Sequence, residues 1–185
     1  MIDNQLRPSG VNADFVLRRM KEVAREDFVP ADARGFAYMD RPIALGGERW
    51  LASPLFHGLA LQAARPRPAD RTLLVDGGSG YLAELLRPMV GTLAVVDPAT
   101  AAEGTADPSE GGYTLLLIEG AVEHIPSALV ALLAPDARVV SGVLRDGVTH
   151  LTIGRPVSGD VALLPVAELG IPVLTEFCLP KRWSF

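Results

Sequence analysis

The sequence of 185 residues is short of cysteine and of basic side chains. Its one cysteine, Cys178, has no partner for an internal disulfide and suits a reducing compartment, so we expect a cytoplasmic protein. The 17 Lys and Arg residues are scattered, they are outnumbered by 22 Asp and Glu, and the net charge is −5. Because a phosphate-binding face needs clustered basic residues, we expect no nucleic-acid partner.

Long apolar runs, a secretory leader and metal-ligand spacing are also missing. The first residues lack the basic-then-apolar pattern of a signal peptide. The longest apolar stretches, 115–118 and 125–134, are much shorter than a membrane span, so we expect no membrane partner. His57, His124 and His150 are far apart in the sequence, which predicts surface or hydrogen-bonded histidines and no metal site.

The remaining composition is that of one globular domain. Apolar residues make up 49% of the chain and charged residues 21%, and the length is ample for one core. We expect a single domain over 1–185. Within it, residues 1–66 are predicted to form a helical and hairpin segment, and residues 67–185 an α/β core.

Local patterns predict the elements of the N-terminal segment. Residues 12–24 have a helical apolar period with Asn12 as a candidate N-cap. Residues 43–45 and 48–51 flank a Gly-Gly turn, which predicts a β-hairpin. A second helix is expected over 54–64, with a serine at its N-cap and a proline at its first position.

The second part of the chain alternates apolar runs with helical stretches, as in a parallel sheet that is covered on both faces. Its end differs, because residues 148–153 and 161–166 are joined by a turn and predict an antiparallel hairpin. That combination favours the methyltransferase variant of the Rossmann-like fold. The other expected strands are 72–75, 92–96, 113–118 and 137–143, and the expected helices are 81–86 and 128–133.

A glycine-rich loop lies between a predicted strand and a predicted helix. Its residues are Asp76, Gly77, Gly78, Ser79 and Gly80. Glycines permit a tight turn and let backbone N–H groups approach a ligand closely. Asp97 ends the next strand, the position from which a carboxylate takes the ribose hydroxyls of an adenosine cofactor. The pattern predicts a cofactor site, while the alternative is that the glycines only turn the chain between strand and helix.

Several phrases of the sequence together resemble one family. They are DNQLR at 3–7, REDFVP at 25–30, AYMDRPI at 37–43, GSGY at 78–81 and, more loosely, IPSAL at 125–129. With these phrases the chain resembles the protein-L-isoaspartate O-methyltransferases. The resemblance implies a Rossmann-like methyltransferase fold and S-adenosylmethionine as cofactor, held by the glycine loop and Asp97. It also implies damaged proteins with isoaspartyl residues as substrates.

Three departures from the family pattern lead us to expect that methyl transfer is reduced or lost. Asp76 replaces the first glycine of the family's loop, where its carboxylate could repel the cofactor's carboxylate or pair with its amino group. Ala52 replaces the serine that holds the substrate in the family. Ser53 could substitute for that serine only if the backbone shifts by one residue, and its simpler role is the helix N-cap.

The third departure is the segment 98–112. It contains two prolines and three glycines without apolar periodicity, which predicts no helix–strand pair there. The sheet would therefore lack one edge strand and its helix, and the adenine pocket would lack a wall. The alternative function is that of a non-catalytic binding or assembly partner.

A few further residues are candidates for a role. Glu119, Glu123 and His124 follow a predicted strand, so they could line the ligand site or be solvated loop residues. Cys178 has no evident base partner and is predicted to be packed. The terminal aromatic residues 183 and 185 could dock on the sheet or on another subunit, so a homodimer is possible.

Overall fold

The computed structural model describes residues 1–104 and 111–179, and its centre is a six-stranded sheet in the order β4-β3-β5-β6-β7-β8. The strands β4, β3, β5 and β6 run parallel, whereas β7 and β8 continue the sheet as an antiparallel meander. Their bounds are β3 Arg71–Val75, β4 Thr92–Val96, β5 Tyr113–Val122, β6 Leu133–Arg145, β7 Val148–Val157 and β8 Asp160–Glu168. The predicted fold class, a mostly parallel Rossmann-like sheet with an antiparallel hairpin at its end, is confirmed.

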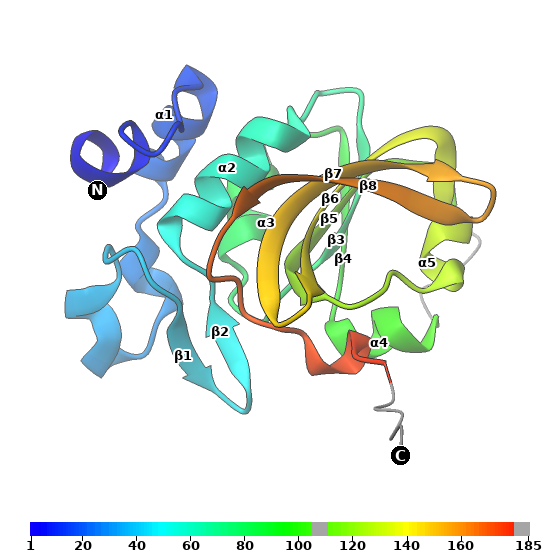
Figure 1. Ribbon diagram of the computed structural model, residues 1–185. Helices are drawn as coiled ribbons and strands as arrows, with labels where there is room; N and C mark the ends of the chain where they lie inside the picture. The colour runs from blue at the N-terminus through cyan, green and yellow to red at the C-terminus, as the bar shows by residue number, and fades with distance from the viewer. Residues whose placement is uncertain (105–110, 180–185) are drawn as a thin grey trace, which may run out of the picture.

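Helices cover both faces of this sheet (Figure 1). Successive residues of a strand point to opposite faces, and the buried residues accordingly divide into two clusters. Leu74, Leu115 and Val140 pack with α1 (Asp14–Glu22), α2 (Pro54–Ala64) and α3 (Tyr81–Leu86). Leu73, Leu116 and Val139 pack with α4 (Pro98–Glu103) and α5 (Ser127–Ala131).

The N-terminal segment lies against the α2 side of the sheet. Its elements are η1 Ile2–Leu6, η2 Arg25–Phe28, η3 Ala31–Phe36, β1 Ile43–Gly46 and β2 Arg49–Leu51. The predicted hairpin is present, because β1 and β2 pair antiparallel. Helix α1 begins two residues later than expected, and Ala13, not Asn12, is at its N-cap position. The Asn12 N–H donates to the side chain of Gln62 (2.9 Å).

The segment after β4 corrects one expectation. Residues 98–103 do form a helix, α4, because Asp97 accepts hydrogen bonds from the Ala99 and Thr100 N–H groups and Pro98 occupies the first helical position. The predicted absence of a helix there is therefore wrong. In the part of the chain that the structure describes, no strand lies between β4 and β5, and β4 is an edge of the sheet.

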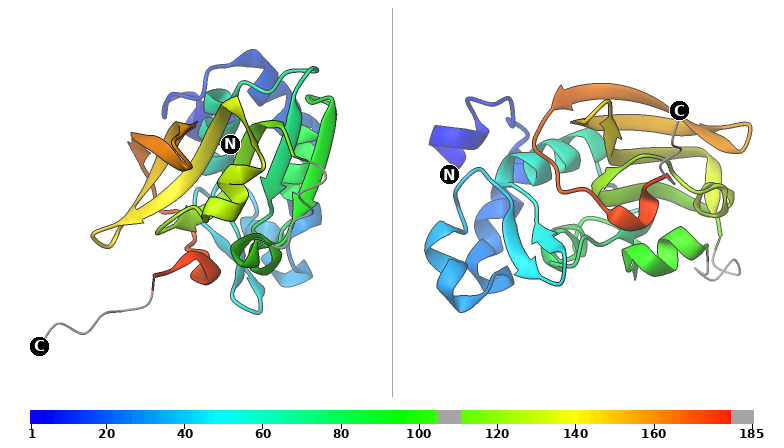
Figure 2. Two further views of the ribbon diagram at one scale, coloured as in Figure 1. Left: turned by 90° about the vertical axis from the view of Figure 1, so that its right-hand side faces the viewer. Right: turned by 60° about the horizontal axis from the view of Figure 1, so that its bottom comes forward.

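The chain after β8 returns across the ends of the parallel strands. The Ala121 N–H donates to the Pro172 carbonyl (2.7 Å), and the Leu174 N–H donates to the Ala121 carbonyl (2.9 Å). The short helix η5, Thr175–Phe177, then lies beside α4, as the right-hand view of Figure 2 shows. Cys178 is exposed and not packed, which corrects the expectation for it. The aromatic residues at 183 and 185 lie outside the described residues.

Among the described residues, no helix combines the length and apolarity needed to cross a membrane.

Candidate functional site

The glycine loop connects β3 to α3 and closes on its own aspartate. The Asp76 carboxylate accepts hydrogen bonds from the N–H groups of Gly78 and Gly80, both at 3.1 Å. Gly78 and Gly80 have φ of +105° and +71°, which only glycine adopts without strain. Gly77 packs so closely on β5 that a Cβ there would lie 2.4 Å from the Glu119 carbonyl oxygen. The loop therefore has the tight geometry that the sequence predicts.

A second carboxylate, that of Glu119 in β5, holds the other side of the loop. It is 2% exposed, and it accepts from the Gly77 N–H and from the Ser79 hydroxyl, each at 3.1 Å. The carboxyl groups of Glu119 and Asp76 lie close enough to shift each other's pKa, and a proton on one of them would let the pair hydrogen-bond. Three loop N–H groups are thus bound by the protein's own carboxylates.

The proton on this pair follows from burial. Burial, followed by the nearby negative charge of Glu119, raises the pKa of Asp76 to about 7. Burial also raises the pKa of Glu119. Two adjacent carboxyls with raised pKa values share a proton near neutral pH, because both cannot ionise cheaply at contact distance.

The Glu119 carboxylate is linked to the N-terminal segment through two buried side chains. His57 Nε2 lies 2.6 Å from Glu119 Oε1, and His57 Nδ1 lies 3.1 Å from a guanidinium nitrogen of Arg25. His57 Nδ1 also lies 3.1 Å from the Ser53 carbonyl oxygen, which can only accept. The contact with Arg25, which can only donate, requires the ring proton on Nε2 toward Glu119, whereas the contact with Ser53 requires it on Nδ1. Burial, and then the charge of Arg25, holds the pKa of His57 well below its usual range, so the ring is neutral.

Arg25 anchors this chain of contacts. Its side chain is fully buried, and it donates to the carbonyl oxygens of Ala37 (2.6 Å) and Ala52. Burial lowers the pKa of Arg25 to about 10, which leaves the guanidinium charged at neutral pH. The contacts Arg25–His57–Glu119 therefore connect the segment that carries Ala52 directly to the glycine loop.

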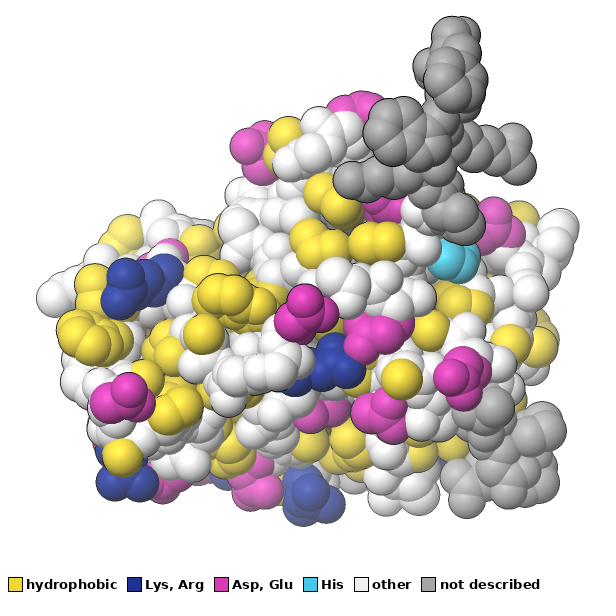
Figure 3. Space-filling view, turned by 90° about the horizontal axis from the view of Figure 1, so that it is seen from below, with side chains coloured by type: hydrophobic (Ala, Val, Ile, Leu, Met, Phe, Trp, Pro, Cys, Tyr) yellow, Lys and Arg dark blue, Asp and Glu magenta, His cyan; other side chains and the backbone are white. Residues whose placement is uncertain are grey.

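An ion pair spans the outer side of the loop. Arg49 of β2 pairs with Glu176 of η5 at 2.5 Å, and a Cβ on Gly78 would lie 3.0 Å from the Arg49 side chain. Figure 3 shows the molecule from the side of η5 and the tip of the β1–β2 hairpin, where acidic side chains gather around a basic group. The β1–β2 hairpin and η5 meet over the glycine loop.

The other predicted site residues have structural roles. Asp97 is exposed and caps α4, since its carboxylate accepts from the Ala99 and Thr100 N–H groups and from the Thr100 hydroxyl (2.6 Å). These hydrogen bonds, that of the Thr100 hydroxyl first, lower the pKa of Asp97. Ser53 is buried, and its side chain accepts from the Phe56 N–H (3.2 Å) as the N-cap of α2.

Of the three acidic and histidine candidates around β5, only Glu119 reaches the loop. Strand β5 runs on to Val122, so Glu119 is part of the strand and not of the loop after it. Glu123 accepts from the Leu179 N–H (2.5 Å), and the His124 ring donates from Nδ1 to the Phe177 carbonyl (3.0 Å). Both hold the C-terminal segment in place.

Sequence reasoning missed Arg25 and His57 as parts of the site. Arg25 stands in the REDFVP phrase and His57 in a helix, and neither position carries a motif that signals a contact with a distant strand. One signal could have found Arg25: it stands in a short segment with apolar residues on both sides. If such a segment packs on the core, a charged side chain within it is buried and needs partners inside the protein. The described residues contain no cluster of ligands suited to a metal ion.

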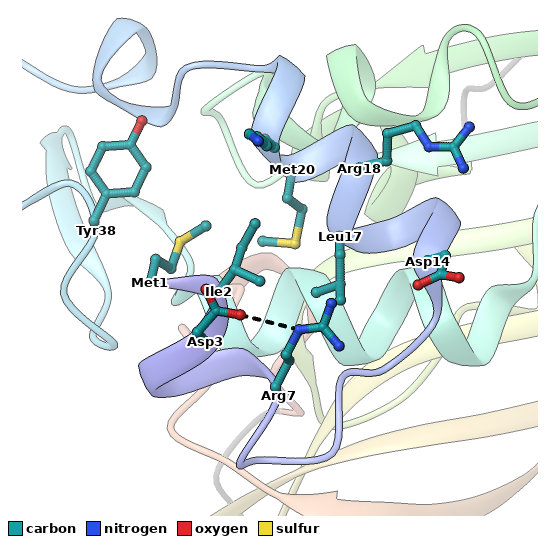
Figure 4. Close-up of a pocket in the computed structure, with 10 residues that line it drawn as sticks. Met1, Ile2, Asp3, Arg7, Asp14, Leu17, Arg18, Met20 and Tyr38 are labelled. Atoms are coloured by element: carbon teal, nitrogen blue, oxygen red, sulfur yellow. Dashed lines mark ion pairs between the residues drawn. The ribbon is translucent and has the colours of Figure 1, made fainter.

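A separate hollow of about 700 Å³ lies between η1, α1 and Tyr38 (Figure 4). Its lining mixes apolar and charged side chains, and the Asp3 carboxylate pairs with Arg7 there (3.3 Å). All the residues that line it come from positions 1–38, so it shares no residue with the glycine loop.

The fold and the loop define a class of protein. A parallel sheet with a glycine loop after β3 and an acid after β4 is a Rossmann-like arrangement of the methyltransferase type. The model of the protein-L-isoaspartate(D-aspartate) O-methyltransferase family matches residues 1–103. The chain belongs to this family.

Curated relatives agree with that assignment. A protein-L-isoaspartate O-methyltransferase of Gloeobacter violaceus is 32% identical over 162 residues, which cover 76% of this chain and 79% of the relative. One of Koribacter versatilis is 29% identical over 86% of this chain and 82% of its own.

A solved structure shows the same fold. It is described as a protein-L-isoaspartate O-methyltransferase of Plasmodium falciparum in complex with S-adenosyl-L-homocysteine, and it superimposes with a TM-score of 0.73. It is 16% identical in sequence and covers 92% of this chain and 95% of the other, so the likeness is one of fold.

Proposed function

We propose that this chain is a protein-L-isoaspartate O-methyltransferase-like protein in which methyl transfer from S-adenosylmethionine to isoaspartyl carboxylates is reduced or lost. One observation carries the proposal. The N–H groups of Gly77, Gly78 and Gly80 already donate to the carboxylates of Glu119 and Asp76. A cofactor that enters the loop must first displace these internal bonds.

The loop also places two acidic groups, Asp76 and Glu119, where backbone N–H groups would receive the carboxylate of S-adenosylmethionine. An ionised Asp76 would repel that carboxylate but attract the cofactor's positively charged amino group, so the effect of the loop's charge depends on which group faces it. The Arg49–Glu176 pair lies over Gly78 and covers the same side. These contacts support weakened binding of S-adenosylmethionine, the cofactor that the family implies.

Two other parts of the expected site, the ribose-binding acid and the substrate-binding serine, also differ from what methyl transfer needs. The Asp97 carboxylate already accepts three hydrogen bonds as the cap of α4, and ribose hydroxyls would compete with them for its oxygens. The place of the family's substrate-binding serine is taken by Ala52, and Ser53 caps α2. These roles support a weak or absent methyl transfer to isoaspartyl proteins.

The second candidate function is that of a fully non-catalytic binding or assembly partner in the cytoplasm. It is favoured by the buried contacts Arg25–His57–Glu119, which tie the glycine loop to the N-terminal segment and engage all three of these side chains within the protein. Homodimer formation belongs to this second candidate.

A methyl-transfer assay tests the proposal. The purified chain and the Gloeobacter violaceus relative are incubated with S-adenosylmethionine and an isoaspartyl peptide, with the aspartyl form of the same peptide as control. We expect the relative to methylate only the isoaspartyl peptide, and this chain to be at least a hundredfold slower. Equal rates for the two proteins would contradict the proposal.

A further inference from the structure

A groove of about 840 Å³ runs between α2 and the β7–β8 hairpin, away from the glycine loop. The hairpin extends past α2, as Figure 1 shows, so part of the sheet face has no helix over it. Leu164 and Val166 of β8 are 64% and 49% exposed there, although both belong to the face that α2 covers further along. The groove has the size of a small-ligand site.

The charges on the groove are of one sign. Four arginines line it, Arg65, Arg67, Arg138 and Arg155, and none of the described residues that line it is acidic. Arg138 is already used, because it pairs with Asp70 (2.5 Å) and donates to the Ala64 and Arg65 carbonyl oxygens. The side chains of the other three arginines have no ion pair or hydrogen bond with any described residue. In a chain of net charge −5, three unpaired arginines around one groove are a local excess of positive charge.

The strand register separates the charged end from the apolar part. Val139 pairs with Gly154, so Arg138 and Arg155, which flank that pair, are neighbours on one face. Arg65, at the end of α2, lies beside them because its carbonyl accepts from Arg138. The apolar pair Ile153–Leu164 lies two residues from the Arg155–Ala162 pair, in the direction away from the β7–β8 turn. Val166 lies two residues further along β8. The groove therefore has a basic end and an apolar length.

We propose that this groove binds a single-chain anionic amphiphile, with its carboxylate at Arg65, Arg67 and Arg155 and its hydrocarbon chain along Leu59, Ile153, Leu164 and Val166. The chain length follows from the strand. From Ala162 to Val166 a strand rises about 13 Å, and a zigzag of carbon–carbon bonds advances about 1.3 Å per carbon, so about ten carbons fill the trough. The site is independent of the cofactor loop and of the proposed function.

The test uses a dansyl-labelled undecanoate as fluorescent probe on the full chain. The expected result is saturable binding, one probe for each protein, with competition by dodecanoate and weaker competition by dodecanol. The cationic analogue dodecyltrimethylammonium is expected to compete at least tenfold more weakly than dodecanoate, because its head group meets the same arginines.

Two variants and a matched control locate the site. Arg155→Glu and Leu164→Glu are each expected to weaken probe binding at least tenfold. Arg145→Glu makes the same change of charge at an exposed arginine that lines no part of the groove, and it is expected to leave binding unchanged. Circular dichroism shows that each variant is folded.

Three results would overturn the assignment. The first is equal competition by the anionic and cationic amphiphiles, and the second is probe binding that Arg155→Glu leaves unchanged. The third is a dimer in size-exclusion chromatography that Leu164→Glu converts to a monomer, since a second copy would then occupy the groove.

Discussion

Replacement of Asp76 by asparagine removes the ionisable carboxyl from the glycine loop and keeps most of its hydrogen bonds. An asparagine oxygen in the place of Oδ2 can accept from the Gly78 N–H (3.1 Å) and the Gly80 N–H (3.3 Å), whereas the NH₂ group in the place of Oδ1 loses the 3.1 Å bond from Gly80, a loss that does not depend on pH. The variant differs from the parent chiefly in that it cannot ionise. Its stability relative to the parent should therefore depend on pH.

The sign and size of this stability difference follow from the raised pKa of Asp76. The folded parent binds the Asp76 proton more tightly than the unfolded chain does, so the parent loses stability as pH rises from the unfolded value toward the folded one. The shift from 3.8 to about 7 corresponds to at most about 4 kcal/mol. Because the proton is shared with Glu119 and Asp76 is partly exposed, we expect the stability of Asp76→Asn relative to the parent to increase by about 2 kcal/mol between pH 5 and pH 8.

Urea denaturation at pH 5, 6, 7 and 8 measures this difference. Asp97→Asn is the matched control, because the pKa of Asp97 is lowered and its carboxylate stays ionised throughout that range. Its effect on the free energy of unfolding should be the same at each of the four pH values. A difference between Asp76→Asn and the parent that does not change with pH would refute the shared proton.

Substitutions at three further positions test the packing on and near the loop. Arg25→Met removes the buried donor to Ala37, Ala52 and His57, and should lower the free energy of unfolding by about 3 kcal/mol in urea denaturation; an effect below about 1 kcal/mol would contradict the buried network. Gly120→Ala places a Cβ 2.5 Å from the Leu174 side chain, which should lower the free energy of unfolding by about 1–3 kcal/mol and make the segment after β8 more sensitive to limited proteolysis. Unchanged proteolysis would contradict this packing. Ser53→Ala should cost about 1 kcal/mol through the lost N-cap, whereas Ser53→Thr keeps a capping hydroxyl without burying a charge, and equal losses in the two variants would argue against the cap.

The sheet could be predicted from the sequence because its strands are short, unbroken apolar runs. Residues 72–75 and 92–96 match β3 and β4 nearly to the residue. The predicted ends of β5, β6, β7 and β8 were too early, since strand pairing continues through positions that lack the apolar pattern, such as Arg155 in β7. Helix α4 was missed because proline and small residues hid its cap at Asp97.

The loop could be located from the sequence, but its state could not. The sequence has a carboxylate at the position of the first glycine, and it left open whether that carboxylate repels the cofactor's carboxylate or pairs with its amino group. The raised pKa of Asp76 depends on burial and on Glu119, a residue 43 positions away, which no local pattern encodes. The contacts Arg25–His57–Glu119 likewise depend on tertiary packing of three separate elements, which no local pattern encodes.

Calorimetric titration of S-adenosyl-L-homocysteine into the unmodified chain tests the central claim most directly, with the Gloeobacter violaceus relative as reference. If the loop N–H groups are closed by Asp76 and Glu119, the relative should show micromolar binding and this chain no saturable heat in the same concentration range. Micromolar binding to this chain would contradict the account of the loop.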